Sequence, residues 1–327
     1  MRTSRISGYK SPLFAVSALA ALLVAGAAGA IPYPEIYAFG DSLSDAGNIY
    51  YYTSHFTSTT EPVSPPYSAG RFSNGPVWVQ DLSAAVGLGT LKPNLTGGTD
   101  YAFGGATTGT SSVHTANQSD LPSQLSMFTS KVPKPNAAAL FTLWIGSNDL
   151  LALLQANKNA ADTTTALNQI LANEQTFVLG LVKAGAKKFV VLTVPDLGLT
   201  PEVSALGSTA SKAGTALAKR FNTALVAKLN KDAKTYKLDL KIVDTLPLID
   251  AAVAKPASYG FTNVKSPCWT GNFTSASSGT VCKSSVAAQD KYLFWDQLHP
   301  TAAGHSQIAK AVESALGVGA PAVVASK

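Results

Sequence analysis

Short apolar runs alternate with longer segments of helical periodicity along most of this chain, and this alternation limits the folds that the chain can adopt. Near-continuous apolar runs are typical of strands that are covered on both faces. The runs expected to form strands lie at residues 35–39, 99–103, 137–145, 187–194 and 238–244. The segments expected to form helices lie at residues 76–86, 121–131, 161–183, 208–236 and 301–316. Strands that alternate with helices predict an α/β fold, in which a parallel sheet carries helices on both faces.

The chain has 327 residues, which is enough for one large domain or two small ones. No internal repeat or linker divides the sequence, so we expect a single domain over residues 31–327. Residues 49–75 and 255–290 have little periodicity and are rich in Ser, Thr, Pro, Gly and Tyr, which predicts long loops. Loops of this length on a compact scaffold are often functional.

Residues 1–30 have the pattern of a secretory signal peptide. Three basic residues precede an apolar stretch at 13–25, and Ala28-Gly29-Ala30 supplies the small residues that a signal peptidase needs. A membrane anchor is the alternative interpretation, but the apolar stretch is shorter than the ~20 residues of a transmembrane helix. We therefore expect cleavage after Ala30 and a secreted, extracellular protein.

Charge and hydropathy argue against two classes of partner. The formal net charge is +6, and it falls to +3 without residues 1–30, since that segment holds three of the 25 basic residues and none of the 19 acidic ones. So small a charge, with no basic run between aromatic residues, does not indicate nucleic acid binding. No later stretch is long and apolar enough to cross a bilayer, and the tail at 317–327 is too short for a lipid-anchor signal. We expect neither stable membrane insertion nor an obligate protein partner.

The two cysteines, Cys268 and Cys282, are expected to form one disulfide, because a secreted chain with an even number of cysteines usually pairs them. No cluster of histidines accompanies them, so they do not indicate a zinc site. Three N-glycosylation sequons begin at Asn94, Asn117 and Asn272, and glycosylation at any of them requires an exposed side chain. Asn272 lies between the two cysteines, which favours a surface loop there.

Ser42 is the candidate nucleophile, because it directly follows the first predicted strand in the segment Gly40-Asp41-Ser42-Leu43. Ligands of a parallel sheet bind at the carboxyl ends of its strands. Gly40 allows a tight exit from the strand, and the start of a following helix offers free backbone N–H groups to a developing negative charge. A serine in this place still needs a base to take its proton.

His299 is the strongest candidate for that base among the four histidines. His55 and His114 lie in polar loops and are interpreted as surface residues, and His305 lies in the last helical segment and is interpreted as structural. Only His299 has an aspartate, Asp296, three residues earlier and a proline directly after it. One turn of chain then places the carboxylate beside the ring, as a Ser-His-Asp triad requires. The alternative interpretation of this Asp-x-x-His-Pro segment is a helix cap.

Two more segments at predicted strand ends could stabilise an oxyanion. Asn148, in Gly146-Ser147-Asn148-Asp149, follows the apolar run at 137–145, and the paired glycines Gly104 and Gly105 follow the run at 99–103. With the N–H of Ser42, the asparagine side chain and one glycine N–H make three donors around one oxyanion. A helix cap is the alternative role for Asn148, and a bulge or turn is the alternative for the glycines.

This pattern resembles the GDSL, or SGNH, family of serine hydrolases, through four blocks in the family's order that cover most of the chain after residue 30. The matches are Ser42 to the nucleophile, Gly105 (or Gly104) to the oxyanion glycine, Asn148 to the oxyanion asparagine, and Asp296 and His299 to the last block. The resemblance implies a three-layer, flavodoxin-like α/β/α fold with five parallel strands, and esterase or lipase activity without a cofactor. The segment Gly70-Arg71-Phe72-Ser73-Asn74-Gly75-Pro76 is also similar to the secreted lecithinase- or haemolysin-like branch.

Two competing motifs are weaker. The nearest approach to the Gly-x-Ser-x-Gly elbow of α/β-hydrolases is Gly304-His305-Ser306-Gln307-Ile308, which lacks the last glycine and lies in a helical segment. Asp41 and Asp45 raise the alternative of a metal site, but no cluster of histidines or carboxylates accompanies them. We interpret Asp45 as a helix cap or as a support for the turn that holds Ser42, and we expect no metal.

The sequence therefore predicts a secreted carboxylic ester hydrolase, an esterase or lipase that acts through Ser42, His299 and Asp296. A polysaccharide O-acetylesterase is the alternative enzyme, and a catalytically inert carbohydrate-binding protein on the same scaffold is the alternative from another class. The substrate is accordingly a small-molecule, lipid or acylated-carbohydrate ester. The aromatic residues expected to line either an acyl slot or a sugar groove are Tyr50, Tyr51, Tyr52, Phe56 and Tyr67.

Overall fold

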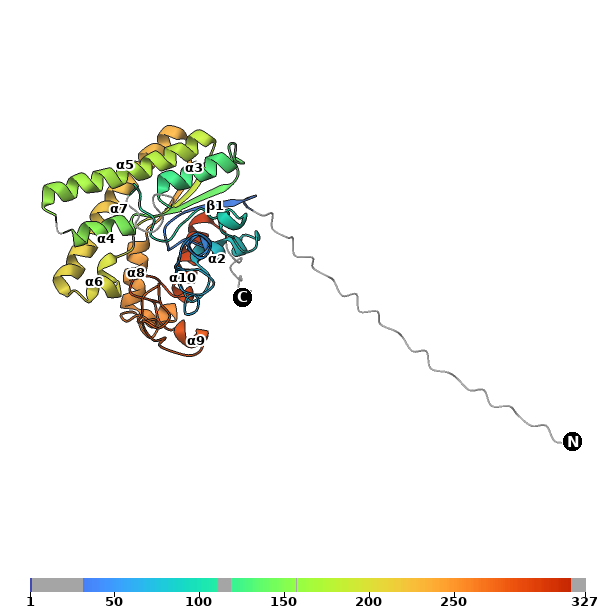
Figure 1. Cartoon of the computed structure of the whole chain (residues 1–327). Helices are drawn as coiled ribbons and strands as arrows, with labels where there is room; N and C mark the ends of the chain where they lie inside the picture. The colour runs from blue at the N-terminus through green and yellow to red at the C-terminus, as the bar shows by residue number, and fades with distance from the viewer. Residues whose placement is uncertain (2–31, 111–118, 157, 319–327) are drawn as a thin grey trace. The chain divides into compact units, whose positions relative to one another are not determined.

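The structure is a computed structural model that describes residues 1, 32–110, 119–156 and 158–318 (Figure 1). The chain divides into two compact units, Met1–Ala30 and Ile31–Lys327, and the fold given below is that of the second unit. Apart from Met1, the expected signal peptide lies outside the described residues, as do His114, Asn117 and residues 319–327. The signal peptide and the single domain therefore stay predictions.

Four strands form one parallel sheet, which confirms the predicted α/β fold. They are β1 (Ile36–Gly40), β2 (Leu140–Trp144), β3 (Lys188–Leu192) and β4 (Asp239–Val243), in the spatial order β1-β2-β3-β4. Gly40 lies opposite Trp144, and Trp144 lies opposite Leu192. The strands therefore end together, and their carboxyl ends form one edge of the sheet.

The predicted fifth strand at 99–103 is an extended segment beside β1 and forms only an isolated bridge with it. Ala38 and Gly40 of β1 bond to this segment: the Ala38 N–H donates to Thr99, and the N–H groups of Tyr101 and Phe103 donate to Ala38 and Gly40. The ladder is interrupted at the Gly40 N–H, which donates to the Gln124 side chain at 3.0 Å. A side chain thus replaces the strand partner, and the described part of the chain forms a sheet of four strands instead of five.

This extended segment nevertheless gives the sheet its topology. It lies on the edge of β1 opposite to β2, because β1 pairs with β2 through its other edge. The segment is the second extended element along the chain, after β1 and before β2. If it is counted, the order across the sheet is 2-1-3-4-5 in chain numbering, which is the order of flavodoxin-like folds. In such sheets ligands bind where the order reverses, beyond the carboxyl ends of the segments that are β1 and β2 here.

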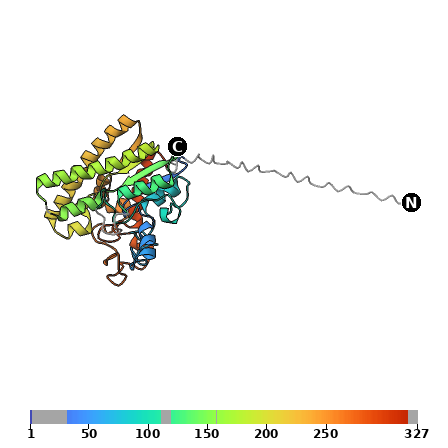
Figure 2. The same ribbon diagram turned by 45° about the horizontal axis from the view of Figure 1, so that its top comes forward.

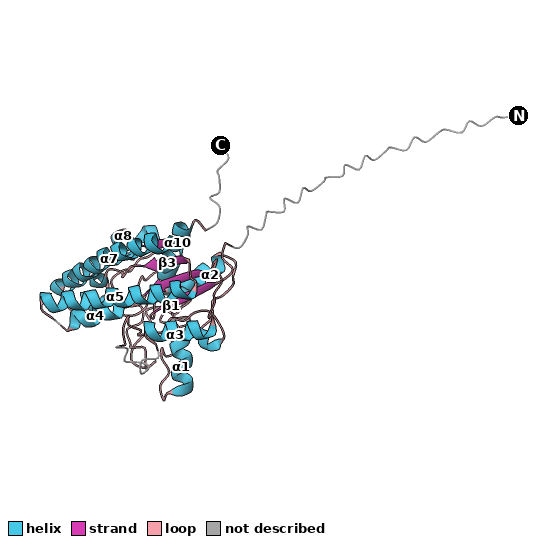
Figure 3. Cartoon of the chain, turned by 90° about the horizontal axis from the view of Figure 1, so that it is seen from above, coloured by secondary structure: helices cyan, strands magenta, loops and turns pink. Residues whose placement is uncertain are grey.

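Helices cover both faces of the sheet, as the three-layer prediction requires. Their bounds lie within two residues of the predicted segments: α2 is Trp78–Ala85, α3 is Leu121–Lys131, α5 is Ala160–Ala184, α7 is Ser208–Tyr236 and α10 is Ala302–Leu316. Alternate strand residues point into two hydrophobic cores, one that packs Phe39 against Phe177 of α5 and one that contains Trp144 and Ile308 of α10. Figure 3 shows the strands between α10 and α3.

The remaining helices are short. They are α1 (Asn48–Phe56), α4 (Ser147–Gln155), α6 (Pro201–Ser204), α8 (Thr245–Ala254) and α9 (Val286–Gln289), with 3-10 turns at Asn94–Thr96, Leu197–Leu199 and Pro256–Tyr259. In the ranges that the structure describes, no helix has both the length and the apolar character to span a membrane.

The loop predicted at 49–75 is wrong for its first part, because α1 occupies residues up to Phe56. The carboxylate of Asp45 accepts hydrogen bonds from the N–H groups of Gly47, Asn48 and Ile49, at 2.7, 2.5 and 3.1 Å. These are the groups that a helix start leaves without partners. The cap therefore stabilises the start of a helix that the sequence analysis did not predict.

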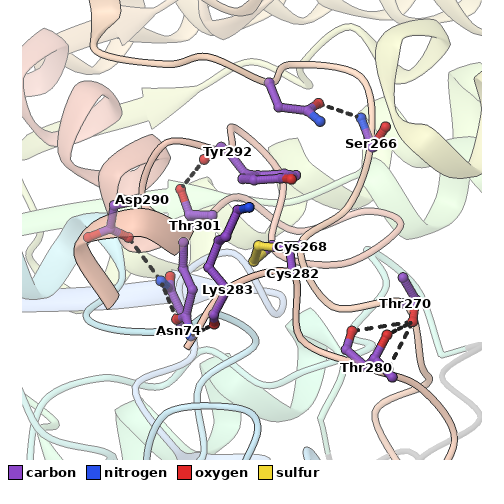
Figure 4. The surroundings of a disulfide bond; sticks show 12 residues. Asn74, Ser266, Cys268, Thr270, Thr280, Cys282, Lys283, Asp290, Tyr292 and Thr301 are labelled. Atoms are coloured by element: carbon purple, nitrogen blue, oxygen red, sulfur yellow. Dashed lines mark hydrogen bonds between the residues drawn. A yellow bond between two sulfur atoms is a disulfide. The ribbon is translucent and has the colours of Figure 1, made fainter. Parts of the chain in front are cut away.

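Cys268 and Cys282 form the predicted disulfide (Figure 4). The loop that it closes is tied to the chain just before Asp296, because the Trp269 N–H donates to the Trp295 carbonyl at 2.5 Å. Figure 2 shows the blue segment that contains α1 next to the orange loops around residues 256–285. The two long loops are thus neighbours, and both flank the end of the sheet.

The sequons differ in exposure. Asn272 is exposed, as expected. Asn94 is only 1% exposed, its Oδ1 accepts a hydrogen bond from Lys131 at 2.8 Å, and its amide nitrogen is buried. The expectation of an exposed side chain is therefore wrong at Asn94, because the nitrogen that would carry a glycan lies inside the fold. Glycosylation at Asn272 stays a prediction.

Candidate active site

The turn after β1 places Ser42 at the carboxyl edge of the sheet. Gly40 has a φ of 143°, and a Cβ on it would lie 2.1 Å from the Trp144 carbonyl oxygen, so only glycine fits. Gln124 of α3 binds both backbone groups of Gly40, since its Nε2 also donates to the Gly40 carbonyl at 2.7 Å. The glycine at position 40 and its two hydrogen bonds with Gln124 therefore fix the direction in which the chain leaves the sheet.

The three predicted triad residues come together. Ser42 Oγ lies 2.8 Å from His299 Nε2, although 257 residues separate the two along the chain. His299 Nδ1 lies 2.7 Å from Asp296 Oδ2. With the Nδ1 proton directed at the carboxylate, Nε2 is free to accept the proton of Ser42.

Asp296 is buried and fully engaged. Its Oδ1 accepts from the backbone N–H groups of Leu298 and His299, at 2.8 and 2.7 Å. Its Oδ2 accepts from the Tyr67 hydroxyl at 2.7 Å, besides the bond from the His299 ring. Backbone groups of the predicted Asp-x-x-His turn thus fix one carboxylate oxygen, and the His299 ring together with Tyr67, from outside that turn, fixes the other.

The electrostatics suit a general base. Burial is the largest single influence on His299 and would lower its pKa. The charge of Asp296, its hydrogen bond to the ring and the charges of Asp41 and Glu202 together outweigh burial and raise that pKa above its ordinary value. Burial alone would raise the pKa of Asp296, but the His299 charge and the hydrogen bonds from His299 and Tyr67 lower it. The pair is therefore built to hold a proton on the imidazole while the carboxylate stays ionised.

Gly104 and Gly105, the two glycines predicted as alternative oxyanion donors, differ in the hydrogen bonds of their N–H groups. The Gly104 N–H donates to Asp45 Oδ2 at 2.8 Å, so it is occupied. No acceptor among the described residues takes the N–H of Gly105, which has a φ of 75°, or the N–H of Ser42. Gly105 is therefore the glycine that keeps a free donor.

Asn148, the third predicted donor, lies in the first turn of α4. One amide hydrogen of its Nδ2 is directed to the Ala106 carbonyl at 2.9 Å, which joins α4 to the glycine loop. An amide carries two hydrogens, so the second remains for an oxyanion. Asn148 also lines the cavity that contains Ser42 and His299.

Asp45 has the first of its two predicted roles, the helix cap, and a further role that the sequence did not indicate. It caps α1, and through Gly104 it also fixes the loop that carries Gly105. Asn48 adds to this support, because its Nδ2 donates to the carbonyls of Asp100 and Ala102, both at 2.8 Å. The described residues include no group of three or more His, Cys, Asp or Glu side chains that could hold a metal ion.

A cavity opens beside Ser42 and His299, with an empty volume of about 600 Å³, its mouth included. The side chains that make most of its wall are apolar: Leu43, Trp144, Leu151, Leu197, Ile249, Phe294, Leu298 and Ile308. None of the five aromatic residues proposed for a slot or groove lines this cavity. Tyr67 is instead buried against Asp296, and Phe56 is 68% exposed. Apolar residues from later strand ends and helices form the wall, because the cavity extends toward β3, α8 and α10.

The other histidines also have defined places. His55 is exposed, as expected for a surface residue. His305 lies in α10, fully buried, and burial lowers its pKa to about 3. Ser306 lies in the same helix, which agrees with the rejection of an α/β-hydrolase elbow there.

Sequence reasoning missed the roles of Gln124 and Phe72, and it expected Tyr67 to line the cavity instead of binding Asp296. The Phe72 ring lies 5.0 Å from the His299 ring, and a Cβ on Gly104 would meet Phe72 at 2.4 Å. Phe72 is part of the Gly70–Pro76 segment that was noted only for its family resemblance. The presence of an aromatic residue in that segment was the one sequence feature that could have indicated Phe72. The sequence did not show that Phe72 contacts His299 and Gly104.

Comparison with known proteins agrees with this geometry. The model of the GDSL-like lipase/acylhydrolase family matches residues 36–312. The chain belongs to this family. It is 28% identical to the thermolabile hemolysin of Vibrio parahaemolyticus, over 84% of this chain and 62% of that one. It is 26% identical to the phosphatidylcholine-sterol acyltransferase of Aeromonas hydrophila, over 89% and 92%.

Other relatives and solved structures are more distant or longer. The anther-specific proline-rich protein APG of Arabidopsis thaliana is 27% identical over 85% of this chain, which spans 60% of that relative. The chain thus spans less than two thirds of the length of this relative and of the hemolysin. Among solved structures, the acetylxylan esterase of Geobacillus stearothermophilus is 16% identical, with a TM-score of 0.40 over 88% of this chain and 96% of that one.

Proposed function

We propose that this protein is a secreted carboxylic ester hydrolase that works through an acyl-enzyme on Ser42. The observation that carries the proposal is the hydrogen-bonded line from Ser42 through His299 to Asp296 at the wall of an apolar cavity. No cofactor takes part in this chemistry, because a serine, its base and donors to an oxyanion suffice for acyl transfer.

In the first half-reaction, Ser42 Oγ attacks the carbonyl carbon of the ester while its proton passes to His299 Nε2. The carbonyl oxygen becomes an oxyanion between the N–H groups of Ser42 and Gly105 and the amide of Asn148. The bond between carbon and the alcohol oxygen then breaks, and His299 gives its proton to that oxygen. An acyl-serine and a free alcohol result.

In the second half-reaction, water takes the place of the alcohol. His299 accepts a proton from the water as its oxygen attacks the acyl carbon, and the same donors hold the new oxyanion. The bond to Ser42 Oγ breaks, and the proton on His299 returns to that oxygen. Asp296 stays ionised throughout and stabilises the imidazolium that forms twice in each cycle.

The cavity wall supports an acyl chain of several carbons more than an acetyl group. Each methylene group of a substrate that is buried against these apolar side chains contributes about 0.8 kcal/mol of favourable transfer free energy. Two of the similar proteins are named for a hemolysin and for an acyltransferase of phosphatidylcholine, which agrees with a lipid ester. The polysaccharide O-acetylesterase stays the second candidate, because it would use the same catalytic residues. The similarity to an acetylxylan esterase, with a TM-score of 0.40, adds no support.

The proposal is tested with purified protein from residue 31 on and p-nitrophenyl esters of increasing chain length, beside acetylated xylan. Ser42→Ala should lower ester turnover by roughly 10⁴-fold or more and leave the fold intact. Butyrate and octanoate esters should react faster than acetate. Near-normal turnover by Ser42→Ala would contradict the proposed mechanism, and a preference for acetylated xylan would favour the acetylesterase.

The third candidate, an inert carbohydrate-binding protein, is tested by labelling with a fluorophosphonate probe, which should modify Ser42 in the folded protein. Absence of labelling would support the binding protein. Secretion is tested separately: expression of the whole sequence in a secreting host should release a protein whose first residue is Ile31. Retention of residues 1–30 on the released protein would contradict the signal peptide.

A further inference from the structure

Tyr67 contacts the active site, although it lies in none of the sequence motifs from which that site was predicted. Its hydroxyl donates to Asp296 Oδ2 at 2.7 Å, across 229 residues of sequence. The same oxygen accepts from His299 Nδ1 at 2.7 Å. Tyr67 is only 2% exposed, and Asp296 only 5%. One buried carboxylate oxygen therefore has two donors, one from the base and one from a phenol.

We propose that Tyr67 is a positioning residue, whose hydroxyl fixes the Asp296 carboxylate toward the His299 ring and limits its pull on the imidazolium proton. The inference rests on the proposed function, because it assigns a role to Tyr67 in the same reaction. Tyr67 does not line the cavity, so it acts through Asp296 and has no contact with the substrate.

The surroundings of Tyr67 hold the phenol in this place. Its ring packs edge-on against Trp295 and Phe72, with 6.1 Å between ring centroids in both pairs. Its N–H donates to the Val63 carbonyl, and the Val63 N–H donates to the Phe273 carbonyl at 2.7 Å. Phe273 lies between the disulfide-linked cysteines. The loop closed by the disulfide and the loop after α1 therefore support the same side chain.

The hydroxyl stays a donor over the whole working range. Burial, and then the charge of Asp296, raise the pKa of Tyr67 above its ordinary value. A neutral phenol beside a carboxylate presents its positive end and withdraws some negative charge from the oxygen that faces His299. Without it, Asp296 Oδ2 would attract the imidazolium more strongly and would have one restraint fewer on its rotation.

A purely structural role predicts something else. The ring alone fills the space between Trp295 and Phe72, and phenylalanine would fill it equally. If the hydroxyl served only stability, its loss would lower the free energy of unfolding and leave the titration of His299 unchanged. The two roles therefore separate in the pH dependence of turnover.

Tyr37→Phe is a matched control. The Tyr37 hydroxyl donates to Glu35 at 2.6 Å, and the residue is 4% exposed, so the same kind of bond is lost. Tyr37 lies near the start of β1, whereas Ser42 follows the end of that strand. The change therefore tests the loss of a hydroxyl–carboxylate bond away from the triad.

The experiment compares wild type, Tyr67→Phe and Tyr37→Phe by thermal unfolding, by kcat and KM on a p-nitrophenyl ester, and by the pH profile of kcat/KM. Tyr67→Phe should lower kcat about tenfold, which is the lower range for a lost hydrogen bond to a charged group, with KM nearly unchanged. The acid limb of kcat/KM should move to higher pH, because His299 would hold its proton more tightly. Asp41, Glu202 and His305 also act on the His299 charge, but they are the same in all three proteins.

Proton NMR adds a readout that does not depend on turnover. The low-field signal of the His299 Nδ1–H should change position in Tyr67→Phe and stay in place in Tyr37→Phe. An acid limb and a low-field signal that match wild type in folded Tyr67→Phe would overturn the inference, whatever the change in kcat. Such a result would leave the proposed function intact as long as Ser42→Ala is inactive, so the two failures are distinguishable.

Discussion

Asp45 accepts a hydrogen bond from the backbone N–H of Gly104 at 2.8 Å, and this bond joins the turn of Ser42 to the loop of Gly105. The same carboxylate caps α1 through three further N–H groups. Asp45→Ala would leave four buried donors without an acceptor. We expect a loss of several kcal/mol in the free energy of unfolding, at about 1–3 kcal/mol for each unsatisfied group.

The same change should also lower kcat, because the Gly105 N–H would lose its fixed direction. Asp45→Asn is the milder variant, since an amide oxygen still accepts from part of these donors. Urea unfolding and ester turnover of both variants check the prediction. A stable Asp45→Ala protein with wild-type kcat would contradict the role of Asp45 in the oxyanion site.

Asn148→Ala should lower kcat by about 10²–10³-fold with little change in KM, because an oxyanion donor acts mainly in the transition state. Asn222→Ala is the control. Its amide is buried near the end of β3 and makes two hydrogen bonds with Val194, at 3.0 and 2.7 Å. Asn222→Ala should lower the free energy of unfolding and keep kcat within about twofold of wild type. The reason is that the Asn222 amide stabilises the fold and has no contact with the reacting ester. Equal losses of kcat in the two variants would argue against an oxyanion role for Asn148.

The sequence predicted the parts of this site that follow from strand ends. Ser42 and Asn148 each follow an apolar run, so a parallel sheet necessarily brings them to one edge. Asp296 and His299 lie within one turn of chain, and their contact depends only on local geometry. These relationships are periodic or local, which is why they can be read from a single sequence.

The supporting contacts are neither periodic nor local. The Gln124 bond to Gly40 spans 84 residues, and the Asp45 bond to Gly104 spans 59. Such bonds depend on the final packing of loops and helices, so the sequence around each residue does not predict which residue it will bond to. The same reason explains the missing fifth strand, because a glutamine on α3 takes the N–H that a strand would have used.

The acid limb of kcat/KM should report the ionisation of His299. Asp296 holds the pKa of His299 above its usual value despite burial, so the base stays protonated, and inactive, to higher pH than a free histidine. Activity should therefore rise with pH through a midpoint above 6.5, the ordinary value for histidine. The measurement is kcat/KM on a neutral ester from pH 5 to 9 at constant ionic strength. A midpoint well below 6.5 would show that burial outweighs Asp296.

Removal of the disulfide, by Cys268→Ser together with Cys282→Ser, should lower the free energy of unfolding by about 3 kcal/mol. The bond closes a loop of 14 residues in sequence separation, and the loop contacts the segment before Asp296. We also expect a lower kcat, because the Phe273 contact to Val63 supports the loop of Tyr67. Reduction of wild type with dithiothreitol should reproduce both effects and should not affect the double variant. Unchanged stability after reduction would contradict the support by this loop.

The ionisation of buried carboxyls, Asp41 among them, should lower the free energy of unfolding as the pH rises from about 4 to about 7. Burial also raises the pKa of Asp100 and of Glu174, so Asp41 accounts for part of this effect. Burial raises the pKa of Asp41 to about 7, and its Oδ2 has no hydrogen-bond partner among the described residues. Burial also raises the pKa of Asp149 to about 6. Between pH 4 and these values the folded protein keeps protons that the unfolded chain has lost, so the free energy of unfolding decreases with pH.

Asp41→Asn keeps the shape of the side chain and removes its ionisation. Urea unfolding at pH 5 and pH 8 should therefore show a smaller difference between the two pH values for Asp41→Asn than for wild type. Asp296 does not confound the comparison, because its pKa is lowered and it is ionised in both states over this window. The same difference between the two pH values in Asp41→Asn and in wild type would contradict a raised pKa for Asp41. His305, whose lowered pKa acts in the opposite direction, is unchanged in this comparison.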